Sequence, residues 1–190
     1  MQSSLSISEK KFLLELARKS IESELRGRVL ELPNVTDRAL LEHRGAFVTL
    51  HKQGNLRGCI GIFESNQPLY RVVADMAISA AFQDPRFPPL RSDEFDLIEI
   101  EISALTPLRE IESPEEITVG EHGIYIIRGP MRGVLLPQVA VEYGWDRYSF
   151  LDQTCIKAGL YPGCWKESGT KILVFSAEVF NESEIFGNKD

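Results

Sequence analysis

Residues 46–63 read AFVTLHKQGNLRGCIGIF, and this stretch decides the kind of sheet that the chain can form. Residues 46–51 have the β-branched and aromatic mix of a strand, and residues 56–63 form a second run of the same kind. Gln53-Gly54-Asn55 separates the two runs. Because a short connection that contains glycine favours a hairpin, we expect the two strands to pair antiparallel.

Helix and strand patterns continue on both sides of this hairpin. The capping box that starts at Ser6 begins a first helix, and residues 68–83 carry an apolar stripe at helical spacing. Residues 95–105 alternate between apolar and polar side chains, which is typical of a half-buried strand. The remaining patterns predict a hairpin, two helices and a last strand, over 124–128 with 134–136, 137–143, 148–158 and 171–180. The sequence therefore predicts an α+β fold, a mainly antiparallel sheet flanked by helices.

The composition argues against several classes of protein. The chain has 190 residues and a formal net charge of −7, so we expect no nucleic-acid partner. No apolar run reaches the length of a membrane helix and no signal-peptide pattern is present, so we expect no membrane association and a cytoplasmic location. Three cysteines without framework spacing fit a reducing compartment, and we expect no disulfide.

Motifs for metals and cofactors are missing from the sequence. Cys155 and Cys164 lack the short paired spacing of zinc sites, and no phosphate-binding glycine loop follows a strand. We expect no metal and no cofactor. Trp145 and Trp165 are expected to anchor a core rather than to form a stacking platform.

Cys59 is the best candidate for chemistry. Gly58 and Gly61 leave space around its sulfur, and strand alternation places Arg57 on the same side, where a guanidinium would raise the thiolate fraction. The same pattern also fits a structural cysteine, because cysteine is often buried and strand glycines also serve bulges or tight packing.

A thiol nucleophile also needs a base, and the candidates are His43, His51 and His122. His51 lies across the hairpin turn from the cysteine segment and is the one expected near it. None of the three belongs to a diagnostic motif, and each also fits a solvated or hydrogen-bonded structural role.

The proline segment 84–90, DPRFPPL, is stiff because proline fixes φ. It either braces a lobe or lines a cleft. Asp84 and Arg86 in this segment either bind an anion or tie the loop with one surface salt bridge.

Four motifs in the same order resemble the AMMECR family, named for the Alport syndrome, mental retardation, midface hypoplasia and elliptocytosis chromosomal region. The motifs are LRGCIG at 56–61, DPRFPPL at 84–90, LPQVA at 136–140 and CIKAGL at 155–160. The resemblance runs from about the first helix to Phe180. It implies a single domain over 1–190 that corresponds to protein A of the AmmeMemoRadiSam system.

The resemblance further implies two lobes, a larger one from 1–50 and 95–190 and a smaller inserted α/β lobe from 51–94, with a cleft between them. It marks the segment around Cys59 and Arg57 as the functional signature. Other residues expected on the surface for a substrate or partner are Gly58, Gly61, Asp84, Arg86 and Gln138. The implied partners are a dioxygenase-like protein of the Memo type and a radical S-adenosylmethionine enzyme.

Two functions stay open on this basis. In the first, the protein is an enzyme or the protein substrate of one, with Cys59 reactive, Arg57 tuning it and Arg86 binding an anionic group. In the second, it is a non-catalytic adaptor that uses the Cys59 segment and the proline segment as a partner surface.

Overall fold

The computed structural model describes residues 4–187 and divides the chain into two compact units. The first unit comprises Met1–Leu105 and Glu178–Asp190, and the second comprises Thr106–Ala177. These boundaries differ from the expected lobes, because residues 51–94 lie inside the first unit. The reason is the pairing of β1 (Ala46–Lys52), which bonds to β2 (Asn55–Ile62) on one side and to β3 (Ile98–Leu105) on the other.

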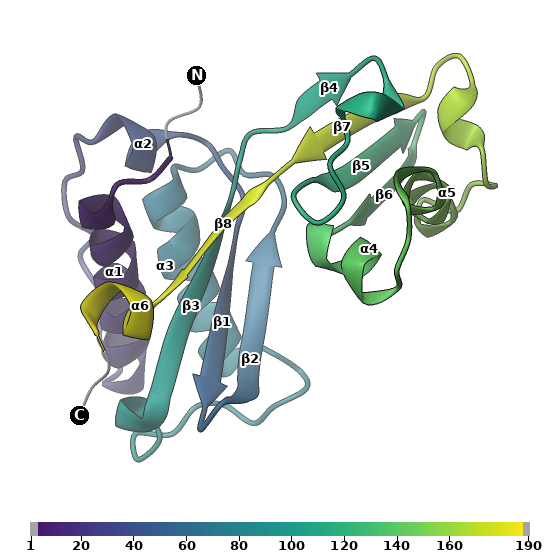
Figure 1. Ribbon diagram of the computed structural model, residues 1–190. Coiled ribbons are helices and arrows are strands. Elements are labelled where there is room, and N and C mark those ends of the chain that lie inside the picture. Colours follow the sequence, from purple (N-terminus) through teal and green to yellow (C-terminus); the bar gives the residue numbers. More distant parts are fainter. Residues whose placement is uncertain (1–3, 188–190) are drawn as a thin grey trace. The chain divides into compact units, whose positions relative to one another are not determined.

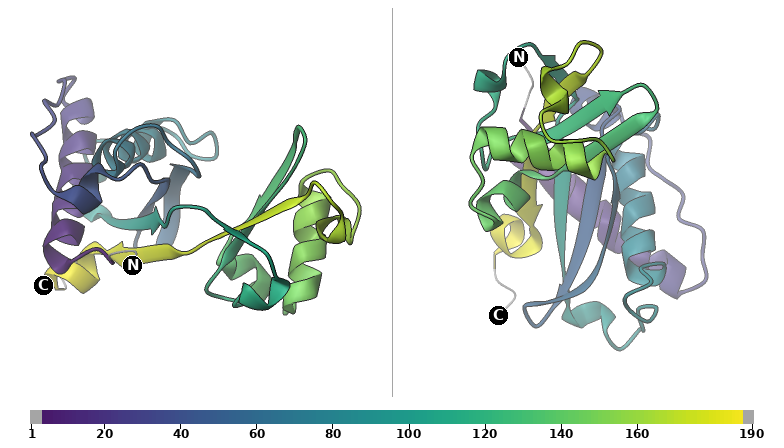
Figure 2. Two further views of the ribbon diagram at one scale, coloured as in Figure 1. Left: turned by 90° about the horizontal axis from the view of Figure 1, so that it is seen from above. Right: turned by 90° about the vertical axis from the view of Figure 1, so that its right-hand side faces the viewer.

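The first unit is a four-stranded sheet with helices packed on it (Figure 1). The strand order is β2-β1-β3-β8, with β8 spanning Ala177–Asn181. Two long helices, α1 (Ile7–Leu25) and α3 (Leu69–Phe82), pack against each other and against one face of this sheet (Figure 2). The shorter elements are α2 (Arg38–Leu41), a 3₁₀ turn at Phe95–Leu97 and α6 (Glu182–Phe186).

The helices begin and bury the faces that their sequences predict. Ser6 caps α1 and closes the predicted capping box with Glu9. In α3 the stripe of Leu69, Val72 and Val73 is buried in the core of the unit. The two longest helices were therefore correctly predicted from capping and apolar spacing.

Strand register sorts the side chains of the first sheet into two faces. Val48 and Leu50 are fully buried against the helices, together with their partners on β3. Residues between them on each strand point to the opposite side. We call that side the cysteine face, and define it by Phe47, Thr49, His51, Cys59, Glu99 and Glu101.

The second unit is another four-stranded sheet, in the order β4-β7-β5-β6. Its strands are β4 (Arg109–Ile111), β5 (Gly123–Arg128), β6 (Met131–Leu135) and β7 (Lys171–Phe175). Its helices are α4 (Pro137–Glu142) and α5 (Arg147–Lys157), with 3₁₀ turns at Pro114–Glu116 and Cys164–Lys166. All the strand pairs β1–β2, β1–β3, β4–β7, β5–β6 and β5–β7 are antiparallel, so the predicted α+β class is confirmed.

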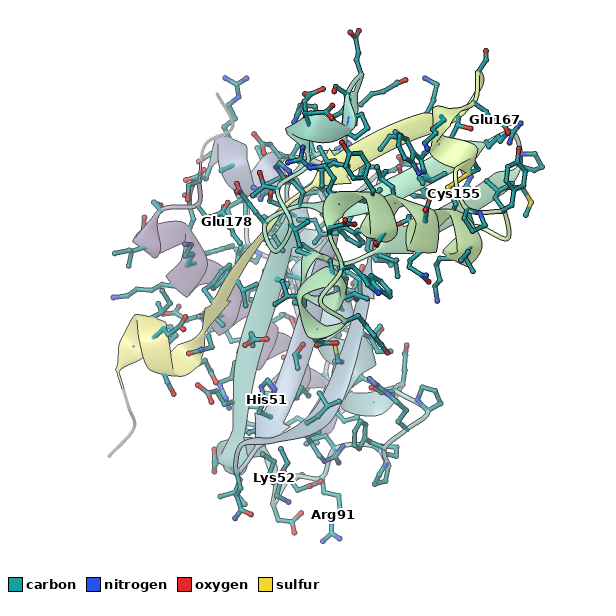
Figure 3. The ribbon with its side chains drawn as sticks, turned by 45° about the vertical axis from the view of Figure 1, so that its right-hand side comes forward. His51, Lys52, Arg91, Cys155, Glu167 and Glu178 are labelled. Carbon is teal, nitrogen blue, oxygen red and sulfur yellow. A yellow bond between two sulfur atoms is a disulfide. The ribbon has the colours of Figure 1, made fainter. Side chains whose placement is uncertain are left out.

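Two predictions for the C-terminal part were wrong. The single strand expected over 171–180 is interrupted at Ser176, and its halves β7 and β8 belong to different sheets. The absence of disulfides was also expected, yet Cys155 and Cys164 are bonded, with their Cα atoms 6.1 Å apart (Figure 3). The end of α5 and the turn at Cys164–Lys166 bring these two residues within the normal Cα separation of disulfides.

No helix within residues 4–187 combines the length and apolarity needed to cross a bilayer.

Candidate functional site

Cys59 lies on β2 directly opposite Thr49 of β1. Its thiol is free and half-buried, and the Thr49 hydroxyl donates a hydrogen bond to the sulfur over 3.1 Å between Oγ1 and Sγ. The next strand places Glu101 opposite Thr49 on the same face. A row of hydroxyl, thiol and carboxylate side chains therefore crosses three strands of the cysteine face.

The backbone of Cys59 is held from both of its polar groups. Its N–H donates to Asp84 Oδ2 at 2.9 Å, and its carbonyl oxygen accepts from Arg86 Nη2 at 3.1 Å. Asp84 is buried and Arg86 is exposed, and the two form a bidentate ion pair with Nη2–Oδ2 at 2.7 Å. This pair fastens the stiff proline segment to β2 at the position of the thiol.

The contact between Asp84 and Arg86 shifts the pKa of both side chains and favours their charged forms. Hydrogen bonds from the Arg86 side chain, followed by those from the Cys59 and Arg86 backbones, hold the pKa of Asp84 well below its usual range despite burial. The same hydrogen bonds to Asp84 raise the pKa of Arg86. Asp84 thus accepts hydrogen bonds from Nε and Nη2 of Arg86, and anion binding by this guanidinium stays a prediction.

Replacing Asp84 by asparagine is expected to lower the free energy of unfolding of the first unit by about 2 kcal/mol, because charged hydrogen bonds at a buried carboxylate are lost. The pKa of Asp84 is lower in the folded state, so its stabilising contribution is present above pH 3.8 and is lost as the pH falls further. Urea unfolding followed by hydrogen exchange of 56–63 measures the change. Asp93→Asn, which removes an exposed carboxylate nearby, is the control with little effect, and equal losses in both variants would argue against the clamp.

Arg57 is placed differently from the sequence-based expectation. The register skips one residue on β2 between the pairs Leu50–Gly58 and His51–Leu56, so Arg57 is the extra residue of a β-bulge. Its buried guanidinium binds Glu94, with Nη2–Oε2 at 2.9 Å, and no contact with the Cys59 sulfur is found among the described residues. The strand alternation that suggested a shared side does not hold across a bulge.

The two flanking glycines have packing roles. A Cβ on Gly58 would lie 2.1 Å from the backbone oxygen of Ala80 in α3, so only glycine permits this close approach of helix and strand. A Cβ on Gly61 would lie 2.3 Å from the ring of Phe47. Packing alone therefore accounts for both glycines, without any need for space around the sulfur.

The candidate bases lie in three different environments. His51 is on the cysteine face, two residues from Thr49, and no hydrogen bond joins it to Cys59 within residues 4–187. His43 is exposed and forms an isolated bridge with Pro68. His122 belongs to the second unit, where its Nδ1 accepts the N–H of Thr118 at 3.0 Å.

The remaining predicted residues lie in the second unit. Gln138 is an exposed residue of α4. Trp145 and Trp165 pack against the core of this unit and stack on Tyr143 and Tyr148, with ring centroids 4.9 and 6.0 Å apart. Both tryptophans thus contact a core, as the sequence led us to expect.

Comparison with known proteins identifies the family. The family model described as AMMECR1 matches residues 14–180. The chain belongs to the AMMECR1 family. Among its relatives are a protein of Methanothermobacter thermautotrophicus, 48% identical over 94% of this chain and 96% of that one, and a protein of Aquifex aeolicus, 43% identical over 92% and 93%. A crystal structure of the uncharacterized protein PH0010 from Pyrococcus horikoshii is similar, with a TM-score of 0.74, 43% identity and 93% of each chain covered.

The chemistry available to this AMMECR1-family member is that of a thiol with a hydroxyl neighbour. No group of three or more His, Cys, Asp or Glu side chains in the described part of the chain could hold a metal ion. Cys59 is the free cysteine, and its sulfur accepts a hydrogen bond from the Thr49 hydroxyl.

Sequence reasoning missed two members of the site, Thr49 and Glu101. Both are ordinary strand residues, and neither belongs to a motif. The register of β1 with β2 places Thr49 opposite Cys59, and the register of β1 with β3 places Glu101 opposite Thr49. The hairpin turn at Gln53-Gly54-Asn55, combined with a one-residue offset at Arg57, could have found Thr49, whereas no local signal marks Glu101.

Proposed function

We propose that this AMMECR1-family protein uses the Cys59 sulfur in a covalent step, either as the nucleophile of an enzyme or as the group that an enzyme modifies. One observation carries the proposal. The half-buried thiol accepts the Thr49 hydrogen bond while both polar groups of its own backbone are fixed by Asp84 and Arg86. A nucleophile held in one geometry loses little freedom on reaction.

The step follows ordinary thiol chemistry. The Cys59 thiol gives its proton to solvent or to a base, and the thiolate attacks an electrophilic carbon. A sulfur–carbon bond forms as the bond to the leaving group breaks, and the leaving group departs with that electron pair. The Thr49 hydroxyl stabilises the thiolate before the attack and releases it as the charge moves away.

A second candidate function is that of an adaptor, and exposed apolar side chains favour it. Leu56 and Val179 lie on the two edge strands of the first sheet and are 42% and 48% exposed. Exposed apolar residues around a sheet face are typical of a protein-binding surface. In this function, a Memo-type or radical S-adenosylmethionine protein in the cytoplasm covers the cysteine face.

Alkylation of Cys59 distinguishes the two functions. Because Cys155 and Cys164 are bonded, the reference for native Cys59 is the same residue in the urea-unfolded chain. For covalent chemistry, iodoacetamide is expected to label native Cys59 within about tenfold of the unfolded rate, since this residue is half-buried rather than sealed in the core. Labelling a hundredfold slower or more would support the adaptor instead.

The role of the Thr49 hydroxyl has its own control. Thr49→Val keeps the shape of the side chain and removes the donor, and is expected to slow alkylation by roughly threefold to tenfold, the value of one hydrogen bond. Thr36→Val, an exposed position outside the sheet, leaves the rate unchanged. An unchanged rate in both variants would contradict the assignment of Thr49.

A further inference from the structure

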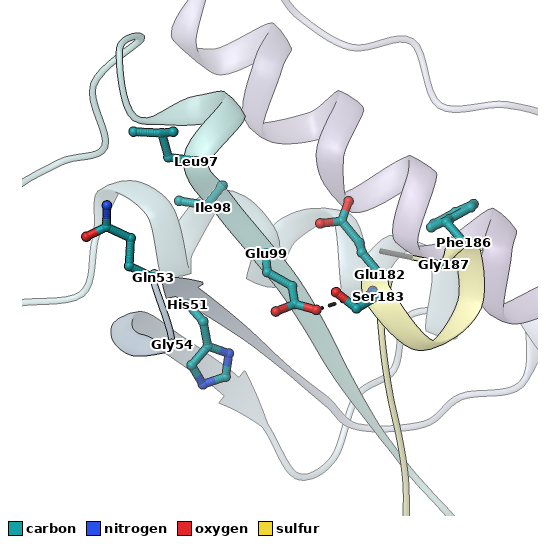
Figure 4. A pocket seen from close by; sticks show the side chains of 10 residues that line it. All are labelled: His51, Gln53, Gly54, Leu97, Ile98, Glu99, Glu182, Ser183, Phe186 and Gly187. Atoms are coloured by element: carbon teal, nitrogen blue, oxygen red, sulfur yellow. Dashed lines mark hydrogen bonds between the residues drawn. The ribbon is translucent and has the colours of Figure 1, made fainter. Parts of the chain in front are cut away.

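A pocket of about 550 Å³ opens in the first unit, at the end of the cysteine face near the β1–β2 turn (Figure 4). Its wall includes His51 and Gly54 from the hairpin, Leu97 from the 3₁₀ turn before β3, Glu99 from the start of β3, and Ser183 and Phe186 from α6. We infer that this pocket binds a small organic cation, an ammonium or guanidinium group carried on an apolar body. Its volume lies in the range of ligand pockets.

The charge of the pocket comes from Glu99. One carboxylate oxygen, Oε1, accepts the backbone N–H of Ser183 at 3.2 Å, and no cationic side chain pairs with Glu99 in the part of the chain that the structure describes. A single amide neighbour leaves most of the acceptor capacity of an ionised carboxylate unused. Glu99 therefore presents a negative charge without a counter-ion to whatever enters the pocket.

The other carboxylate of the wall is already neutralised. Glu182 forms a bidentate pair with Arg18 at 2.5 Å and accepts the N–H of Ile100 at 2.9 Å. Arg18 also donates to the carbonyl of Ile98, so this pair satisfies backbone groups at the start of β3. Glu182 thus has a structural role in the wall of the pocket, and the negative charge of the pocket comes from Glu99.

The remaining wall fits the apolar body of such a ligand. Leu97 and Phe186 are 54% and 45% exposed, and both line the pocket. Phe186 adds an aromatic ring to the wall, and ring faces attract positive charge. His51, the cross-strand partner of Glu99, adds a ring nitrogen that can accept or donate a hydrogen bond.

A metal ion fits this pocket less well than an organic cation. Within residues 4–187 no three His, Cys, Asp or Glu side chains are arranged to hold a metal. Of the three His, Asp or Glu side chains in the wall, Glu182 is bound by Arg18, which leaves His51 and Glu99, whereas protein metal sites supply three or more ligands. An anion is disfavoured by the charge of Glu99.

Three compounds of similar shape test the inference: benzylamine, benzyl alcohol and benzoate. Titrations followed by amide chemical shifts of Gly54 and Gly187 are expected to show saturable benzylamine binding in the millimolar range, as suits a fragment of this size. Benzyl alcohol is expected to bind at least tenfold more weakly, and benzoate more weakly still. Equal binding of the alcohol or preference for benzoate would overturn the inference, as would the absence of saturable benzylamine binding.

Matched variants locate the binding. Glu99→Gln is expected to weaken benzylamine binding at least tenfold, because a charge-assisted hydrogen bond becomes neutral. Glu101→Gln removes the same charge from the same strand face two residues away, outside the pocket wall, and is expected to change the affinity less than threefold. Equal losses in the two variants would contradict a site at Glu99.

A second variant, Phe186→Ala, tests the pocket independently in case Glu99→Gln does not fold. Phe186→Ala removes an exposed side chain and is expected to weaken benzylamine binding severalfold while the amide spectrum stays native. Unchanged binding would contradict the apolar wall. Cys59→Ser leaves benzylamine binding intact, so this inference and the proposed thiol chemistry stand or fail separately.

Discussion

Arg57→Met is expected to lower the free energy of unfolding of the first unit by about 3 kcal/mol. The Arg57 side chain is 9% exposed and its guanidinium forms two hydrogen bonds to Glu94, whose side chain is 14% exposed. Removing the arginine leaves a largely buried carboxylate with only the partly exposed Lys52 as a charged partner. Removing one member of a buried ion pair lowers stability more than breaking an exposed pair or shortening a surface side chain.

The measurement must report on the first unit alone. Both tryptophans lie in the second unit, so tryptophan fluorescence does not follow this transition. Hydrogen exchange of peptides from α3, read at increasing urea concentrations, does. Arg91→Met, in the same loop with an exposed pair to Asp93, is the matched control and is expected to change stability by less than about 0.5 kcal/mol. If the two variants lose the same stability, the buried pair is not formed.

The pH dependence gives an independent check of the same pair. Hydrogen bonds from Arg57, then from Lys52, lower the pKa of Glu94 from 4.5 to about 2. A folded-state pKa below the unfolded value means that Glu94 stabilises the fold above pH 4.5 and loses that contribution between pH 4.5 and 2, roughly 3 kcal/mol in all. The stability difference between the wild type and Glu94→Gln is therefore expected to shrink across this range. A constant difference would mean that Arg57 does not lower the pKa.

The elements that local patterns specify were predictable, and those that depend on distant pairing were not. The capping box at Ser6 and the stripe of α3 act within a few residues, and both appear as expected. The division of the chain depends on β1 pairing with β3, fifty residues away. No local pattern in residues 46–52 indicates that β1 pairs with β3. The expected lobe boundaries therefore differ from those of the two units. The interruption at Ser176 was also unpredictable from local sequence. The residues on both sides of it have strand-like sequences, and only their pairing with different sheets separates them.

The candidate site shows the same division. Cys59, Asp84 and Arg86 stood out in the sequence, and the structure brings these three together. Arg57 was expected at the sulfur because alternation was extended through a bulge that the sequence does not mark. Thr49 and Glu101 escaped notice because their relation to Cys59 exists only across strands. The pocket around Glu99 escaped notice because it joins the β1–β2 hairpin and the start of β3 to a helix near the C-terminus.

Removing the disulfide between Cys155 and Cys164 is expected to lower the free energy of unfolding of the second unit by about 2.5 to 3 kcal/mol. The bond joins residues nine apart, and closing a loop of that length restricts the unfolded chain by about this amount. Both cysteines are fully buried and belong to the second core, so their replacement also removes packing. The Cys155→Ser, Cys164→Ser double variant is therefore expected to show the larger loss of stability. Reduction of the wild-type bond measures the loss that is due to the missing cross-link alone.

The two tryptophans make the second unit directly observable, since Trp165 lies next to Cys164 and Trp145 packs on the same core. Urea unfolding followed by their fluorescence is expected to shift to lower urea after reduction, while Cys59→Ser leaves the transition in place because Cys59 belongs to the first unit. Counting thiols in the unfolded, unreduced chain tests the bond itself: one reactive thiol is expected and three would show that it is absent. Because both sulfurs are shielded in the folded unit, a thiol reductant is expected to open the bond only through unfolding of this unit. Reduction that is fast compared with unfolding would contradict that shielding and would make the bond a candidate for redox control instead of a structural link.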